Sequence, residues 1–121
     1  MYHSTSSTRK LRPLMIPFAL AALLGISANV RAADVDVAAA EALAKKSNCT
    51  KCHAVDKKKE GPSFKETAAK YKGKADAEAK LVTQLTTGPK VKVDGVEEEH
   101  AIVKTKDPAE IKNLIQYILS R

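Results

Sequence analysis

Two cysteines and a histidine stand within five residues of each other, in the segment Cys49-Thr50-Lys51-Cys52-His53. This C-x-x-C-H spacing is typical of the attachment site of a c-type haem. The two thiols add across the vinyl groups of one porphyrin edge, and the histidine that follows is placed to bind the iron. The sequence therefore predicts one covalently bound haem c, with Cys49 and Cys52 as its attachment points and His53 as the proximal ligand of the iron.

Three other interpretations use the same residues. A disulfide between Cys49 and Cys52 suits an oxidising compartment, but a thioredoxin-like redox motif belongs beside a βαβ pattern that the sequence lacks. A zinc site could combine both cysteines with His53 and His100, although structural zinc sites typically place their two histidines about three to five residues apart. The third alternative is that both cysteines are unmodified, which would leave a pair of thiols in an exported protein unexplained.

The first part of the chain has the order of a secretory signal peptide. A basic start with Arg9, Lys10 and Arg12 precedes the apolar stretch Leu14–Ile26. That stretch is shorter than the roughly 20 residues of a membrane-spanning helix and falls within the range of a signal-peptide core. An uncleaved membrane anchor is the alternative, and the short apolar run with Pro17 inside it argues against one.

The cleavage position follows from the residues after the apolar stretch. The segment Val30–Ala32 offers the small or compact residues that signal peptidase recognises, so we expect cleavage after Ala32. Cleavage after Ala33 ranks second, because it would put Arg31 where a small residue is needed. The sequence thus predicts a signal peptide over residues 1–32 and export to the periplasm, with no permanent membrane anchor.

Removal of the signal peptide changes both the charge and the size of the chain. The formal charge falls from +7 to +3, because the removed segment holds four of the 21 basic residues and none of the 14 acidic ones. A nucleic-acid-binding protein needs a strongly basic, clustered surface, so we expect no nucleic acid as a partner. The remaining 89 residues, 33–121, are expected to form one small domain. Such a domain usually needs a disulfide, a metal or a cofactor, and an inserted haem would supply the missing apolar core.

Helical periodicity predicts two helices in the first half of the mature chain. The first is expected over residues 36–47, with these residues on one face: Val35, Ala38, Ala39, Ala42 and Leu43. The charged segment 57–62 is broken by Gly61-Pro62 and predicts a surface loop. A second helix is expected over residues 63–72, with Ser63 as its cap.

A third helix is expected over residues 76–87, with Asp76 as its N-cap. Leu81, Val82 and Leu85 recur in it at helical spacing, and Gly88-Pro89 follows. Residues 88–106 show no helical periodicity, which predicts an irregular connection. Connections of this length in small domains are usually functional or disordered.

The last helix has the clearest signals of the chain. Asp107 stands at the N-cap position, Pro108 at the first helical position and Glu110 at the capping-box position. An apolar stripe follows at helical spacing: Ile111, Leu114, Ile115, Ile118 and Leu119. The predicted fold class is all-α, with about four short helices around one haem.

Taken together, these segments resemble the small monohaem class I cytochromes c of bacterial periplasms. The likeness covers essentially the whole mature chain, including the motif at 49–53, Gly61-Pro62, the segments 64–71 and 77–81, and the C-terminal Tyr117–Ser120. It implies a cytochrome c-like fold and a cytochrome c domain over residues 33–121.

The resemblance also implies two contacts. The prolyl carbonyl of the family that matches Pro62 accepts a hydrogen bond from the proximal imidazole, and such a bond would orient His53 and raise its basicity. The first and last helices of the family pack together, which here pairs the Ala39/Leu43 face with these residues: Leu114, Tyr117 and Ile118. Tyr117 is therefore interpreted as a packing residue rather than a redox relay.

The chain departs from that family at the second axial ligand, which in most members is a methionine from the loop before the last helix. The two methionines, Met1 and Met15, both lie in the predicted signal peptide. In the corresponding loop stands His100, which is the one mature histidine besides His53. Imidazole suits iron, so we expect His100 as the distal ligand, with a weaker ligand such as lysine or an empty position as alternatives. Bis-histidine ligation predicts a low-spin iron and a potential below that of methionine-ligated relatives.

The predicted function is that of a periplasmic electron carrier and not an enzyme. Its partners are expected to be redox proteins that dock transiently at the haem edge, near four lysines of the motif region: Lys51, Lys57, Lys58 and Lys59. Two alternatives remain, namely a haem-based binder or sensor of nitric oxide, carbon monoxide or oxygen, and a cytochrome subunit of an oxidoreductase.

Overall fold

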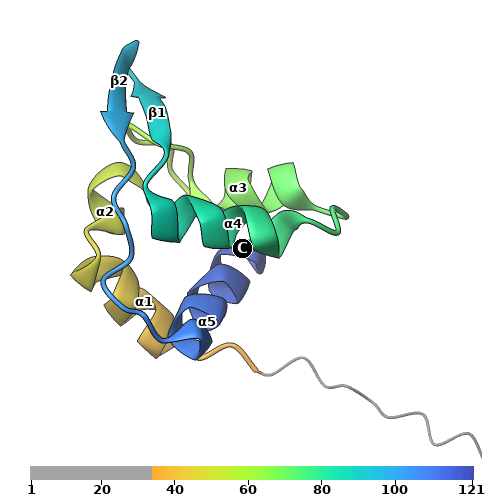
Figure 1. The fold of residues 1–121 in the computed structure, drawn as a ribbon. Helices are drawn as coiled ribbons and strands as arrows, with labels where there is room; N and C mark the ends of the chain where they lie inside the picture. Colours follow the sequence, from red (N-terminus) through yellow and green to blue (C-terminus); the bar gives the residue numbers. More distant parts are fainter. Residues whose placement is uncertain (1–33) are drawn as a thin grey trace, which may run out of the picture. The chain divides into compact units, whose positions relative to one another are not determined.

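The computed structural model describes residues 34–121, and the predicted signal peptide over residues 1–32 lies outside the described residues. The described residues form five helices and one antiparallel pair of strands (Figure 1), in this order: α1 (Val37–Lys46), α2 (Cys49–Cys52), α3 (Phe64–Tyr71), α4 (Ala77–Thr87), β1 (Lys90–Val93), β2 (Val96–Glu99) and α5 (Pro108–Leu119). This confirms the predicted all-α class, to which the structure adds the one-turn helix α2 and the hairpin. Within residues 34–121, no helix combines the length and apolarity needed to cross a membrane.

Two helices begin where their capping residues predict. The Ser63 hydroxyl accepts a hydrogen bond from the N–H of Glu66 at 3.1 Å, and the Glu66 carboxylate accepts one from the N–H of Ser63 at 2.7 Å. This complete capping box starts α3. The Asp107 carboxylate accepts a hydrogen bond from the N–H of Ala109 at 2.8 Å and starts α5 with Pro108 in its first turn.

Two details of the predicted capping are wrong. Glu110 closes no capping box on Asp107, because its carboxylate accepts a hydrogen bond from the Thr105 hydroxyl, which itself accepts from the N–H of Asp107 at 3.1 Å. Asp76 stands at the N-cap of α4 without a side-chain cap and forms an exposed ion pair with Lys80 at 2.7 Å. Exposed pairs of this kind add little stability.

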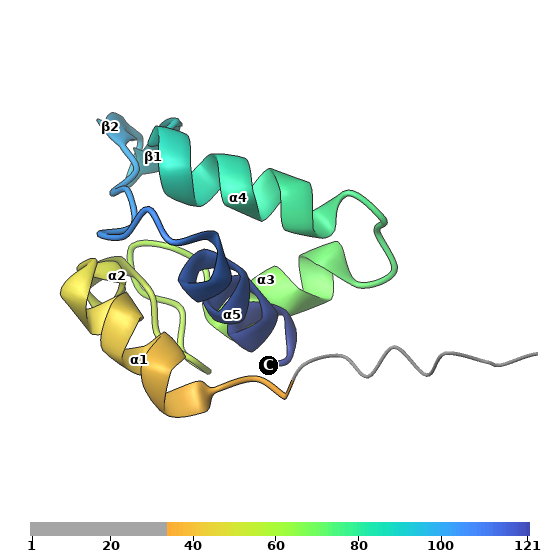
Figure 2. The same ribbon diagram turned by 60° about the horizontal axis from the view of Figure 1, so that its bottom comes forward.

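The core forms around α5, which packs against α1, α3 and α4 (Figure 2). Leu114 and Ile115 are 0% exposed, and Tyr117 is 1% exposed and donates its hydroxyl to Glu41 at 3.0 Å. The predicted apolar stripe of α5 is confirmed, except that Leu119 is only partly buried. Tyr117 is a packing residue at the centre of this core.

The predicted inner face of α1 is largely wrong. Leu43 is buried, but Ala38, Ala39 and Ala42 are exposed, and the other buried residues of α1 are Ala40 and Ala44. Alanine occurs on every side of this helix, so the spacing of its apolar residues does not show which face is buried. Val82 in α4 is also exposed, while Leu81 and Leu85 on the same helix are buried.

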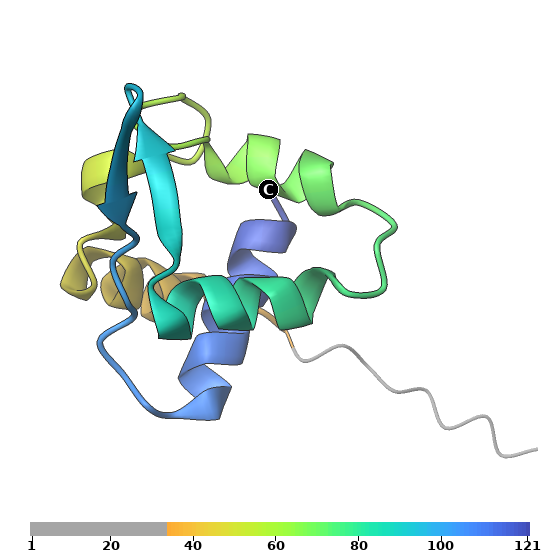
Figure 3. The same ribbon diagram turned by 45° about the horizontal axis from the view of Figure 1, so that its top comes forward.

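Part of the connection predicted to be irregular is a β-hairpin. β1 and β2 pair in an antiparallel register that sets Val93 opposite Val96 and Lys90 opposite Glu99. The residues between the strands, Asp94 and Gly95, have φ angles of 49° and 85°. An Asp-Gly pair with positive φ at both positions is the favoured two-residue hairpin turn. Figure 3 shows the hairpin rising between the end of α4 and the return to α5.

Candidate cofactor site

A cavity of about 850 Å³ opens among α2, α3, α4, the hairpin and α5. All five site residues predicted from the sequence lie on its wall: Cys49, Cys52, His53, Pro62 and His100. Its apolar lining comes from the helices and from β1: Phe64, Leu81, Leu85, Leu114, Ile118, Val91 and Val93. Cofactor cavities are typically of about 300–1,000 Å³, mostly apolar, with a few placed polar groups. The cavity therefore suits a flat, apolar cofactor held at one edge.

α2 brings the two cysteines to the cavity. Cys49 and Cys52 are the first and last residues of this single turn, and residues three apart in a helix share a face. Asn48 makes the sharp exit from α1 with a φ of 60°, and the N–H of His53 donates to the carbonyl of Cys49 at 2.9 Å. The two thiols and the imidazole are thus held as one local unit.

Both thiols are free and not joined as a disulfide. Burial raises the pKa of Cys49, and a hydrogen bond of 3.1 Å to the Glu60 carboxylate raises the pKa of Cys52 above its ordinary value of 9.0. Neither thiol has the lowered pKa that activates reactive cysteines. Among residues 34–121, no cluster of three or more His, Cys, Asp or Glu side chains suits a metal ion, which argues against the zinc interpretation.

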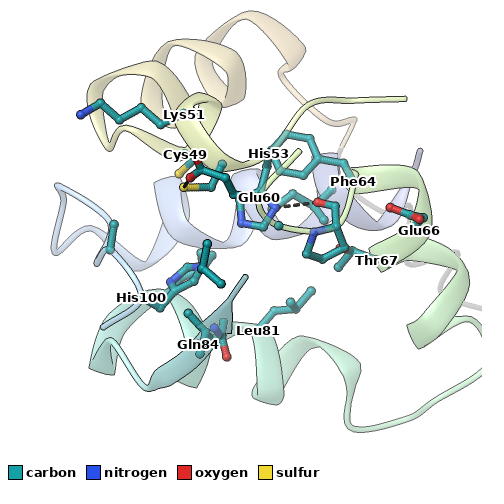
Figure 4. A pocket seen from close by; sticks show the side chains of 18 of the residues that line it. Cys49, Lys51, His53, Glu60, Phe64, Glu66, Thr67, Leu81, Gln84 and His100 are labelled. Atoms are coloured by element: carbon teal, nitrogen blue, oxygen red, sulfur yellow. Dashed lines mark hydrogen bonds between the residues drawn. The ribbon is translucent and has the colours of Figure 1, made fainter. Parts of the chain in front are cut away.

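The His53 ring is held from several directions (Figure 4). Its Nδ1 donates to the carbonyl oxygen of Pro62 at 2.6 Å, which leaves Nε2 as the free ring nitrogen. The Phe64 ring stacks on it at a centroid distance of 5.9 Å and an interplanar angle of 22°. Gly61 lies against the imidazole, and its N–H donates to the carbonyl of Cys52 at 2.8 Å. The contact with Gly61 was not predicted, because the sequence marks Gly61-Pro62 only as a turn.

His100 follows β2 and faces His53 across the cavity (Figure 4). The two ring centroids are 6.0 Å apart, with an interplanar angle of 50°. Two imidazoles that bind one metal ion from opposite sides, with metal–nitrogen bonds of roughly 2 Å, also have centroids about 6 Å apart. The spacing therefore fits one iron between the two rings.

The surroundings of His100 favour its neutral form. Burial, and to a smaller extent the neighbouring His53, lower the pKa of His100 below its ordinary value of 6.5, against smaller opposing effects of the nearby backbone. Its Nδ1 is buried and has no hydrogen-bond partner. Neutral imidazole is the form that binds metals.

The rim of the cavity is mixed in charge. Of the four lysines predicted to surround the opening, Lys51 and Lys58 line the cavity, and Lys59 donates to the carbonyl of Thr50 at 2.5 Å. Carboxylates that the sequence analysis did not place at the rim also line it: Glu60, Glu66, Glu98 and Glu99. The predicted lysine-lined edge is therefore interrupted by acidic side chains from the hairpin, from α3 and from the loop after α2.

The family model and the relatives that match this chain all belong to one family. The family model for cytochrome c matches residues 37–121. Cytochrome c-551 of Pseudomonas aeruginosa is 39% identical over 74 residues, which are 61% of this chain and 70% of that protein. Cytochrome c-552 of Nitrosomonas europaea is 44% identical over 71 residues, which are 59% of this chain and 61% of that protein.

Solved structures agree with this assignment. The class 1 cytochrome MtoD of Sideroxydans lithotrophicus matches with a TM-score of 0.68 and 58% identity, over 71% of this chain and 96% of that one. Wild-type cytochrome c552 of Nitrosomonas europaea matches with a TM-score of 0.52 and 32% identity, over 66% of this chain and 96% of that one. The chain therefore belongs to the cytochrome c family, as an electron-transfer protein, rather than an enzyme, that binds one covalent c-type haem.

Proposed function

We propose that the mature chain is a periplasmic electron carrier with two histidine ligands to its iron. In this proposal, the thiols of Cys49 and Cys52 hold the cofactor, His53 binds the iron on one side and His100 binds it on the other. The bound haem supplies an iron that accepts and releases single electrons. The Pro62 carbonyl fixes the tautomer and direction of His53 through the 2.6 Å hydrogen bond from Nδ1.

The spacing of 6.0 Å between the rings of His53 and His100 carries this proposal. Methionine is not available as the distal ligand, because Met1 and Met15 both fall in the predicted signal peptide. Lysine is a weaker candidate. Lys92 lines the cavity, but an ammonium group must lose its proton before it binds a metal, whereas burial already favours neutral His100.

Export and partner docking complete the proposal. The sequence of residues 1–32 supports cleavage after Ala32 and delivery to the periplasm, which the amino-terminal sequence of the purified protein would test directly. Lys51 and Lys58 at the cavity wall, with Lys57 and Lys59 nearby in the chain, would steer an acidic redox partner to the cofactor edge. Such contacts are small and transient.

The decisive experiment replaces His100 in the haem-loaded protein. Wild-type protein should have a low-spin ferric spectrum, and H100A should become high-spin. The control is K92A, which removes the rival ligand and should leave the spectrum low-spin. A low-spin H100A protein, or a high-spin K92A protein, would overturn the assignment of His100.

Carbon monoxide distinguishes a carrier from a small-ligand binder. If His100 stays bound during function, the ferrous wild-type protein should react slowly with carbon monoxide, and the H100A protein should react rapidly. Rapid binding by the wild-type protein would favour a haem-based ligand binder instead.

A further inference from the structure

The segment that carries His100 is attached by its backbone to the end of α4. The N–H of His100 donates to the carbonyl of Pro89 at 3.0 Å, and the N–H of Val103 donates to the carbonyl of Leu85 at 2.8 Å. In the sequence, Gly88 lies between Leu85 and Pro89, whose carbonyl groups accept these two hydrogen bonds. The position of His100 is thus set where the segment packs against the end of α4.

Gly88 leaves no space for a side chain at this contact. A Cβ at residue 88 would lie 2.9 Å from the carbonyl oxygen of His100 and 3.1 Å from Cγ2 of Ile102. The Ile102 side chain is exposed and can turn aside. The carbonyl of His100 belongs to the backbone, so it can move only together with residue 100.

A shift of the backbone at residue 100 also moves the His100 ring. Its Nδ1 is buried without a partner, and its centroid lies 6.0 Å from that of His53. Side chains of a binding site need to stay within about 0.5 Å of their productive geometry. A backbone shift of a few tenths of an ångström at residue 100 consumes much of that tolerance.

We propose that Gly88 is a positioning residue for His100. The missing Cβ lets the His100 carbonyl pack against the end of α4, and this close approach sets how far the imidazole reaches towards His53. The inference rests on the proposed function, in which His100 is the second ligand of the iron. A side chain at residue 88 should therefore weaken the ligation by His100 without touching the ring itself.

Two other glycines provide matched controls. Gly73 and Gly95 have φ angles of +72° and +85°, close to the +60° of Gly88, and a Cβ at either would meet no atom within 4 Å. Alanine at any of the three positions adds the same kind of backbone strain. Only alanine at residue 88 adds the contact with His100.

The experiment compares G88A, G73A and G95A as haem-loaded proteins. We expect G88A to show an increased high-spin ferric fraction and a carbon monoxide affinity raised on the order of 3- to 10-fold in the ferrous state. The apparent affinity rises because it scales with the fraction of molecules whose site is open. G73A and G95A should keep the wild-type spectrum and affinity. If G88A fails to fold, G88N keeps the Cβ contact with a residue that tolerates positive φ.

H100A, measured in parallel, separates the two possible failures. If H100A stays low-spin, the assignment of His100 fails, and the role of Gly88 fails with it. If H100A becomes high-spin while G88A or G88N matches the two control variants, only the positioning role of Gly88 is overturned.

Discussion

Gly61 lies so close to the His53 ring that a Cβ at residue 61 would stand 2.5 Å from Cε1 and 2.9 Å from Nδ1. The absence of a side chain, and not an unusual backbone angle, is what this position requires. We predict that G61A pushes the imidazole away from the Pro62 carbonyl and destabilises the haem-loaded protein by about 1–3 kcal/mol, the usual range for overpacking. Denaturant unfolding, with the reduction potential measured on the same samples, checks this.

G73A is the control for G61A, because a Cβ at residue 73 meets nothing within 4 Å. The potential of G73A should equal that of the wild type. If G61A and G73A gave the same stability and the same potential, close packing of Gly61 on His53 would have no energetic role.

The lysines near the cavity predict a salt-dependent reaction rate. Oxidation of the reduced protein by ferricyanide, a small anion, should slow as ionic strength rises, because salt screens the attraction to the positive charges. The double variant K51Q/K58Q, which removes the two lysines of this group that line the cavity, should react more slowly and depend less on salt. K106Q/K112Q changes the same amount of charge at residues that do not line the cavity. Equal rates for the two double variants would exclude local steering.

The capping box of α3 predicts a pH-dependent contribution to stability. Hydrogen bonds from the N–H and hydroxyl of Ser63 lower the pKa of the Glu66 carboxyl below 4.5. Because the folded pKa is the lower one, the stabilisation is complete above the unfolded pKa and is lost as pH falls through the folded pKa. The stability difference between the wild type and E66Q should therefore be largest near neutral pH and vanish in acid.

Unfolding curves across the acid range test the Glu66 prediction. E78Q is the control, since Glu78 lies in the first turn of α4, where the N-cap side chain makes no hydrogen bond. A stability difference between the wild type and E66Q that stayed constant with pH would contradict the assigned role of the carboxylate.

Asn113 ties the start of the described chain to α5. Its side-chain oxygen accepts a hydrogen bond from the N–H of Asp36 at 2.9 Å, and its amide donates to the carbonyl of Asp36 at 2.8 Å. N113A should lose about 1–2 kcal/mol of unfolding free energy, the net worth of two exposed hydrogen bonds. K112A, at the neighbouring exposed position, should change little. Because alanine favours a helix at both positions, a loss in K112A as large as that in N113A would show that the effect does not come from the hydrogen bonds of Asn113.

Local signals predicted much of the fold because they act within one turn of the chain. Ser63 and Glu66 form their box three residues apart, and Asp107 with Pro108 starts α5 where expected. The C-x-x-C-H motif is equally local, since α2 alone brings both thiols to the same face.

The rest of the fold depends on contacts between distant segments, except for the hairpin, which has a local signal of its own. The Asp94-Gly95 pair between alternating residues is a strong hairpin signal that could have identified β1 and β2. The buried face of α1 is set by its packing against α5, and it could not be predicted because alanines lie on every side of α1. The pairing of His100 with His53 was expected only from the family resemblance and the lack of a mature methionine, because the approach depends on where residue 103 returns to residue 85, which no local pattern specifies.

The central position of α5 has a consequence for how this protein is made. Every element that packs against α5 precedes it in the chain, so the core around Leu114 and Ile115 cannot close until the last helix has been synthesised. Contacts between distant segments form only after the intervening chain has been brought together, which slows folding. A chain truncated before residue 108 should therefore stay open to proteases even with its two thiols intact.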